Sequence, residues 1–259
     1  MPATVSPIAP FSVTAMSAMF NPELALHCVR LSAEIYRDFA DIRFPSTPNA
    51  KVTLLPSETK GIDTQAAVLY QEEHSRIFLA FRGSDSKDDW RSNIQFRQQI
   101  YPYGDESKTD VRLHRGFMAA YFAVRDRVLD VMKQHPSATV IVTGHSLGGA
   151  LATVAALDVQ YNITQHTQQP LAVYSFGAPR VGNAALVESF EQRVPHSYRY
   201  VYGHDLVTHI PRVWQGYRHV PTAINYGPSF SWNVFSRKFK DHEIQNYITA
   251  LEVALHQGS

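Results

Sequence analysis

The serine at position 146 stands in a context that turns a weak nucleophile into a reactive one. Gly144, Ser146 and Gly148 form a G-x-S-x-G motif, preceded by a β-branched run at 139–143 and followed by small, helix-forming residues. A strand–turn–helix of this kind holds the serine on a sharp, strained turn, and glycine avoids collisions two positions to either side. The helix that follows also directs its positive end towards the reacting carbonyl. We therefore interpret Ser146 as a nucleophile.

A serine hydroxyl needs a histidine to take its proton and a carboxylate to orient that histidine. In proteins whose nucleophile lies on such a strand–turn–helix, the acid and then the histidine follow the serine along the chain, at the ends of successive strands. Asp205 follows a strand-like run at 198–202, and His242 precedes the last predicted helix. Asp158 would lie in the nucleophile's own helix and face away. We predict Asp205 as the orienting acid and His242 as the base, with His219 as the alternative base.

The elements that must position these residues alternate between strands and helices. Apolar periodicity predicts helices at 22–39 (with Asn21 as the N-cap), 116–135, 147–160, 181–193 and 241–256, and strands at 52–55, 66–70, 77–81, 139–143, 171–176 and 198–202. This order predicts an α/β fold, a mostly parallel central sheet with helices on both faces. We find no internal repeat and no low-complexity linker, so we expect residues 1–259 to form a single catalytic domain.

Composition excludes several other classes of protein. A formal net charge of +1 gives no basic stripe for nucleic acid, so no nucleic-acid partner is expected. Cys28 is the sole cysteine, so no disulfide can form within the chain. Residues 1–20 lack Lys and Arg and contain three prolines, which suits an arm on the protein body and neither a signal peptide nor a transmembrane segment. No H-E-x-x-H or comparable spacing occurs, so we expect no metal and no cofactor; the sequence predicts no compartment.

Five segments resemble the class 3 lipase family, the fungal-type triacylglycerol lipases and their bacterial and plant relatives. They are IFLAFRGS (77–84), LHRGF (113–117), VTGHSLGGA (142–150), YSFGAPRVGN (174–183) and YGHDLVTHIP (202–211). The resemblance runs from about residue 65 to 247. It implies the α/β-hydrolase fold and hydrolysis of carboxylic esters of lipids through an acyl-enzyme. Ser146, Asp205 and His242 occupy the family's triad positions.

The resemblance also implies an oxyanion hole and a lid. The oxyanion donors would be the backbone N–H of Leu147 and, at the end of the 77–81 strand, Ser84. Relatives carry a short lid after this point, which here would be the strongly charged segment 85–94. Its candidate contacts are Asp88, Trp90 and Ile94. Fungal members usually carry disulfides, so the single cysteine indicates a bacterial-type branch.

Three functions remain open at this stage. A triacylglycerol lipase, acting on an acyl-ester lipid at a lipid–water interface, leads. A carboxylesterase or feruloyl-type esterase follows, because the charged lid segment suits more polar esters. A lipase-like scaffold that binds a partner without catalysis is the third. The aromatic stretch 213–239, which includes Trp214 and Tyr217, either contacts lipid or packs in the core.

Overall fold

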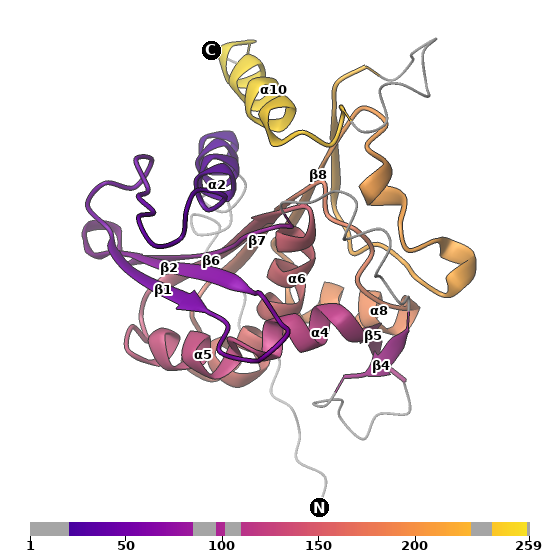
Figure 1. The fold of residues 1–259 in the computed structure, drawn as a ribbon, viewed down its shortest axis with the longest axis horizontal. Helices are drawn as coiled ribbons and strands as arrows, with labels where there is room; N and C mark the ends of the chain where they lie inside the picture. The colour runs from indigo at the N-terminus through magenta and orange to yellow at the C-terminus, as the bar shows by residue number, and fades with distance from the viewer. Residues whose placement is uncertain (1–20, 85–96, 102–109, 229–239, 258–259) are drawn as a thin grey trace, which may run out of the picture.

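The central sheet positions Ser146 and Asp205, each of which follows the carboxyl end of one of its strands. The computed structural model describes residues 21–84, 97–101, 110–228 and 240–257. Among these, seven strands form one sheet in the order β1-β2-β3-β6-β7-β8-β9 (Figure 1). Their bounds are β1 Lys51–Pro56, β2 Gln65–Gln71, β3 Arg76–Phe81, β6 Thr139–His145, β7 Leu171–Phe176, β8 Ser197–Tyr202 and β9 Ala223–Tyr226. Strands β3 to β9 of this sheet run parallel and β1 to β3 antiparallel, so the predicted mostly parallel sheet is confirmed.

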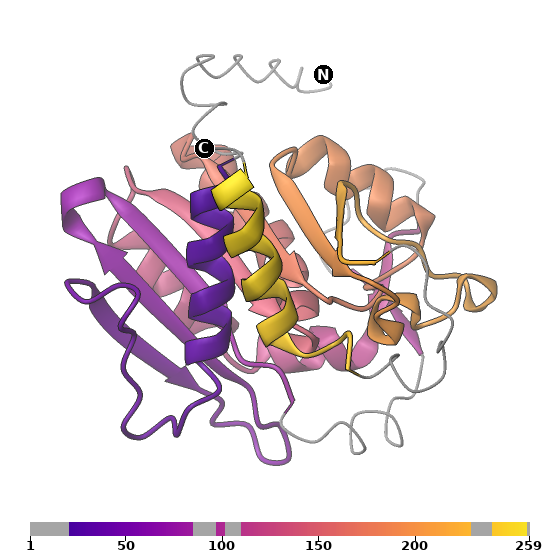
Figure 2. The ribbon, with the colours of Figure 1, turned by 90° about the horizontal axis from the view of Figure 1, so that it is seen from above.

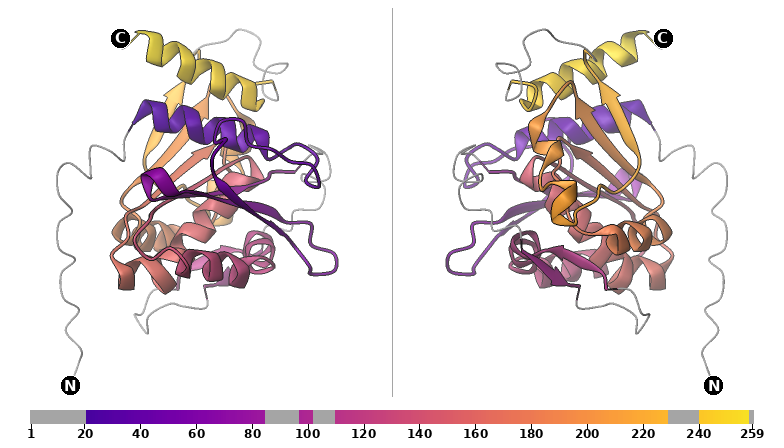
Figure 3. Two further views of the ribbon diagram at one scale, coloured as in Figure 1. Left: turned by 90° about the vertical axis from the view of Figure 1, so that its left-hand side faces the viewer. Right: turned by 90° about the vertical axis from the view of Figure 1, so that its right-hand side faces the viewer.

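Helices cover both faces of the sheet. Helices α2 and α10 lie side by side on one face, as Figures 2 and 3 show, and α4, α5, α6 and α8 lie on the other. Their bounds are α2 Pro22–Glu34, α4 Arg115–Phe122, α5 Arg125–Lys133, α6 Leu147–Val159, α7 Gln165–Thr167, α8 Ala184–Arg193 and α10 Ile244–Gln257. Successive side chains of a strand point to opposite faces. In β6, Val140 and Val142 therefore join the core under α6, and Ile141 joins the core under α2.

The start of α2 follows the predicted signals. Pro22 opens the helix, where its missing N–H costs no hydrogen bond. Asn21 is the N-cap, and its side-chain oxygen accepts a 2.7 Å hydrogen bond from the N–H of Glu23. The helix ends at Glu34 rather than at 39 as predicted.

Other predictions need correction. The helix predicted at 116–135 is two helices, α4 and α5, separated at Ala123 and Val124. Tyr121, Val124 and Val128 are buried on both sides of the break, so the apolar spacing continues through it and hides it. The last helix begins at Ile244 rather than 241. Strands β4 (Gln98–Ile100), β5 (Arg112–His114) and β9 were not predicted, because each is too short to show an alternating pattern.

Two further predictions concern the N-terminal arm and transmembrane segments. The arm predicted at residues 1–20 lies outside the described residues. In the described ranges, no helix has both the length and the apolar character needed to cross a membrane.

Candidate active site

The turn at Ser146 has the strained geometry that its motif predicts. β6 ends at His145 and α6 begins at Leu147, so Ser146 alone joins strand to helix. Its backbone has φ 58° and ψ −128°, a conformation that side-chain-bearing residues rarely adopt. A Cβ at Gly144 would lie 2.3 Å from the carbonyl oxygen of Gly148, and one at Gly148 would lie 2.2 Å from that of Phe81. Glycine is therefore required at both positions.

Three predicted residues form one hydrogen-bonded chain at this turn. Nε2 of His242 lies 2.8 Å from Oγ of Ser146, and Nδ1 of the same ring lies 2.7 Å from Oδ2 of Asp205. Asp205 comes from the turn after β8, and His242 comes from the turn before α10. All three side chains are buried. This arrangement lets an imidazole accept the serine proton while a carboxylate faces its other nitrogen.

The carboxylate of Asp205 is fully buried and accepts further hydrogen bonds. The N–H of Val207 donates to Oδ1 at 2.9 Å, and the hydroxyl of Tyr247 donates to Oδ2 at 2.6 Å. Burial, followed by the nearby Asp205 carboxylate, raises the pKa of Tyr247 well above its ordinary value, so its hydroxyl keeps its proton. Such donors compensate a buried charge. The sequence analysis assigned Tyr247 no role.

The segment that carries Ser84 runs alongside the nucleophile turn. A Cβ at Gly83 would lie 2.8 Å from the carbonyl oxygen of His145, which shows how closely the two main chains approach. The N–H of Leu147 belongs to the first turn of α6, where no preceding helical carbonyl is available to accept it. Both predicted oxyanion donors therefore belong to segments in contact at this turn. The predicted lid contacts Asp88, Trp90 and Ile94 lie outside the described residues.

Asp158 and His219, the other acid and the other base considered from the sequence, have different hydrogen-bond partners. Asp158 is buried on α6, where it accepts a 2.8 Å hydrogen bond from the hydroxyl of Tyr121 and pairs with Arg125 at 3.1 Å. His219 contacts the carbonyl oxygen of Thr208, and burial lowers the pKa of His219 to about 3. Among the hydrogen bonds between described residues, none links either group to the Ser146 hydroxyl.

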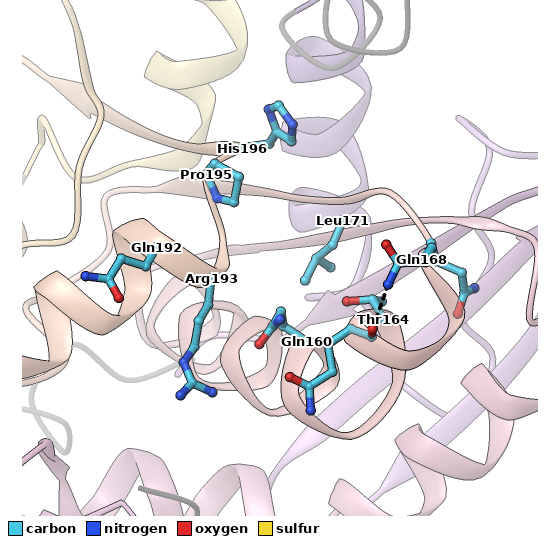
Figure 4. Close-up of a pocket in the computed structure, with 10 residues that line it drawn as sticks. Gln160, Thr164, Gln168, Leu171, Gln192, Arg193, Pro195 and His196 are labelled. Carbon is cyan, nitrogen blue, oxygen red and sulfur yellow. Dashed lines mark hydrogen bonds between the residues drawn. The ribbon is translucent and has the colours of Figure 1, made fainter. Parts of the chain in front are cut away.

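A pocket with several glutamines in its lining lies near the amino end of β7 (Figure 4). It borders Leu171, at the amino end of β7, whereas Ser146 follows the carboxyl end of β6. Its amides already hold main chain in place: Gln168 donates to the carbonyl of Gln165 and Gln169 donates to that of Ala138, both at 2.8 Å. We assign this pocket no part in the chemistry at Ser146.

Within the described part of the aromatic stretch 213–239, residues 213–228, two aromatic side chains lie in different environments. Tyr217 is fully buried, so it belongs to the core. Trp214 is 83 % exposed, in a 3₁₀ helix at Val213–Gln215. Burial therefore assigns Tyr217 to the core, whereas the lipid contact stays a prediction for the exposed Trp214.

The chain is similar in sequence to lipases. Residues 78–214 match the family model for class 3 lipases. A lipase of Rhizomucor miehei is 35 % identical over 161 residues, which is 61 % of this chain and 43 % of the relative. A secreted mono- and diacylglycerol lipase of Penicillium cyclopium is 30 % identical over 168 residues, covering 63 % of this chain and 52 % of the relative. The chain thus spans about half the length of these curated relatives.

Solved structures agree in fold. A triacylglycerol lipase described as having a serine protease triad at its catalytic centre superposes with a TM-score of 0.67 and 29 % identity, over 80 % of each chain. A Rhizomucor miehei triacylglyceride lipase gives 0.65 and 28 %, over 84 % of this chain and 81 % of the other. The fold is that of an α/β-hydrolase, and the chain belongs to the class 3 lipase family.

Proposed function

We propose that this chain is a serine hydrolase that cleaves carboxylic esters of lipids, as a triacylglycerol lipase does. The observation that carries the proposal is the chain of two hydrogen bonds from Ser146 through His242 to Asp205, at 2.8 and 2.7 Å. A protein that only binds a partner has no physical need for these two hydrogen bonds or for a serine on a strained turn. Membership of the class 3 lipase family supports oxygen esters over amides as substrates.

The reaction follows from the order of the three hydrogen-bonded groups. As Oγ of Ser146 attacks the ester carbonyl, Nε2 of His242 accepts its proton, and Asp205 stabilises the resulting imidazolium. The tetrahedral intermediate collapses when the C–O bond to the alcohol breaks and Nε2 returns the proton to the departing oxygen. Water then attacks the acyl-enzyme with the same base, which releases the carboxylic acid and restores the serine.

The negative oxygen of each tetrahedral intermediate needs fixed donors. The N–H of Leu147 and the N–H or hydroxyl of Ser84 are our candidates, supported by the contact between their segments and by the family resemblance. Each such donor is typically worth about 10²–10³-fold in rate.

The substrate is proposed to be an acyl-ester lipid met at a lipid–water interface. Trp214 is 83 % exposed, and the flanking Arg212 and Arg218 are also exposed. Tryptophan favours such interfaces because its ring is apolar and its N–H is polar, and arginine attracts anionic headgroups. We infer that this exposed group forms part of the lipid contact.

Two finer assignments follow the same reasoning. Cys28 is buried and is the sole cysteine, so the chain lacks the disulfides usual in fungal members, which favours a bacterial-type branch. The described strands form one seven-stranded sheet and one two-stranded sheet. Only the larger sheet is long enough to organise a core, which supports the proposal of one catalytic domain.

Covalent labelling tests the proposal without assuming a substrate. A fluorophosphonate probe should modify the wild-type chain at Ser146, and peptide mass spectrometry should locate the adduct there. His242→Ala should label far more slowly, because the base that activates the serine is missing. Labelling of wild type and His242→Ala at equal rates would reject the proposed mechanism.

A further inference from the structure

His145 lies against the proposed base, yet the reaction described above gives it no role. Its ring is buried and stacks on the ring of His242, with the centroids 4.6 Å apart and 29° between the planes. Its Nε2 lies 2.8 Å from the main-chain carbonyl oxygen of His242. Its Nδ1 lies 3.1 Å from the hydroxyl of Tyr36. One face and both nitrogens of this ring are therefore engaged.

These contacts determine which nitrogen of His145 carries the proton. A carbonyl oxygen only accepts hydrogen bonds, so the contact with His242 requires a proton on Nε2 of His145. In the neutral ring Nδ1 is then an acceptor, to which the hydroxyl of Tyr36 donates. Tyr36 thereby favours the tautomer that His145 needs in order to hold His242.

His242 lies in a turn just before α10, where the main chain is not held by helical hydrogen bonds. Asp205 contacts Nδ1 of its side chain and Ser146 contacts Nε2, but neither of these contacts holds the main chain of His242. The hydrogen bond from His145 fixes the main chain of the same residue, and the stacked ring blocks one face. A displacement of about 1 Å in a reacting group can cost about 10²-fold in rate, so this restraint matters for catalysis.

Tyr36 also contacts the segment that carries Ser84. A Cβ at Gly83 would lie 2.0 Å from the hydroxyl oxygen of Tyr36, so that hydroxyl lies directly against the main chain there. Tyr36 follows α2, a helix on the face of the sheet that α10 also covers. One hydroxyl therefore touches the support of the base and the segment of a proposed oxyanion donor.

We propose that His145 and Tyr36 are positioning residues, which hold the main chain and ring plane of His242 so that its Nε2 faces Ser146. The inference rests on the proposed function, because the base they position is the one assigned there. It adds two residues, separated by 109 positions in the chain, that act through His242 and not on the substrate.

Four variants test the proposal. His145→Leu removes both ring nitrogens, and His145→Gln keeps an N–H donor at the end of the side chain, near the place of Nε2. Tyr36→Phe removes only the hydroxyl. Tyr70→Phe is the matched control, because Tyr70 also stacks on a histidine, His135, at the other end of the strands. Thermal unfolding of each variant checks that it folds.

The kinetic readout is the hydrolysis of a dissolved p-nitrophenyl ester. We expect kcat to fall by about 10²-fold in His145→Leu and about tenfold in Tyr36→Phe, with KM unchanged, because the substrate does not touch either residue. His145→Gln should recover most of the loss, and Tyr70→Phe should match wild type. Equal kcat in wild type, His145→Leu and Tyr36→Phe would overturn the proposal.

A spectroscopic readout separates this inference from the proposed function. The proton between Nδ1 of His242 and Asp205 should give a far-downfield NMR resonance, identified by its loss in His242→Ala. That resonance should shift or broaden in His145→Leu and Tyr36→Phe and stay in place in Tyr70→Phe. If it is unchanged in both test variants, the positioning role is wrong. A wild type that hydrolyses no ester would reject the proposed function, and the resonance would still decide the positioning role.

Discussion

Tyr247 donates its hydroxyl proton to Oδ2 of Asp205 at 2.6 Å, the same oxygen that faces Nδ1 of His242 at 2.7 Å. One carboxylate oxygen thus contacts a residue of the last helix and a residue two positions before the start of that helix. Because Tyr247 and His242 both belong to the last part of the described chain, the docking of α10 on the sheet also places the base.

Replacing Tyr247 by phenylalanine should weaken the fold more than the chemistry. A hydrogen bond to a charged group is worth about 1.5–3 kcal/mol, and the N–H of Val207 still donates to the carboxylate. We expect the free energy of unfolding to fall by about that amount and kcat to fall less than about tenfold, because the orienting carboxylate remains. Asp205→Asn should instead lower kcat by about 10³–10⁴-fold, because the amide favours the wrong tautomer of His242. Urea titration and steady-state kinetics measure both effects. Losses of kcat of similar size in the two variants would contradict this division of roles.

Gly177 should not tolerate a side chain. Its φ is +58°, and a Cβ there would lie 2.7 Å from Oδ2 of Asp205 and 3.1 Å from Cε1 of His242. Gly177→Ala should lower kcat by about 100-fold through displacement of both groups. Gly61→Ala is the matched control, because φ is +82° but nothing lies within 4 Å of the added Cβ. It should lose about 1–2 kcal/mol of stability and keep its kcat. Equal activity in the two variants would show that the crowding at Gly177 has no catalytic consequence.

Acid should destabilise the fold through buried histidines. Burial lowers the pKa of His114 to about 4 and that of His219 to about 3, from 6.5. The unfolded chain binds these protons more readily, so stability is complete above pH 6.5 and falls as the pH drops towards 4 and 3. The expected loss is about 1 kcal/mol for each group at pH 5.5.

His114 offers a direct check of this linkage. Its Nδ1 accepts from the N–H groups of Gly116 and Phe117 at the start of α4, a role that protonation would end. His114→Asn keeps an N-cap acceptor that does not titrate, so the melting temperature should fall less between pH 7 and pH 5 than in wild type. His166→Gln, at an exposed position, should follow the wild-type curve. A His114→Asn curve parallel to wild type would show that this group does not contribute.

Trp214 should matter only when the substrate is part of a surface. Trp214→Ala should reduce binding to vesicles containing phosphatidylglycerol and hydrolysis of emulsified esters, while hydrolysis of dissolved esters stays at the wild-type rate. Val52→Ala changes another exposed apolar residue, on β1, and should alter neither. Flotation of the protein with vesicles measures the binding. Unchanged binding in Trp214→Ala would remove this residue from the proposed lipid contact.

Much of the fold could be predicted because its signals are local. The β-branched run before Ser146 and the small residues after it mark a strand and a helix next to each other in the chain, and Gly144 reflects a contact within the turn between them. The alternation of strands with helices then requires a largely parallel sheet, which the structure has. The break between α4 and α5 was missed because its apolar spacing is continuous.

The positioning residues Tyr36 and His145 could not be predicted because their partners are distant in the chain. Tyr36 meets His145 across 109 positions, and His145 meets the carbonyl of His242 across 97. Neither contact leaves a spacing that a single sequence reveals. Trp214 and Tyr217 are three positions apart and chemically alike, yet one is exposed and the other buried, because the chain turns between them at Gly216.

Hydrolysis of p-nitrophenyl esters from acetate to palmitate, with wild type beside Ser146→Ala, tests the central claim most directly. We predict turnover by wild type that is greatest on long acyl chains and is lost in Ser146→Ala, which lacks the nucleophile. Greatest turnover on short chains would indicate an esterase that uses the same three residues. Turnover retained in Ser146→Ala, or no turnover of any ester by wild type, would contradict the account.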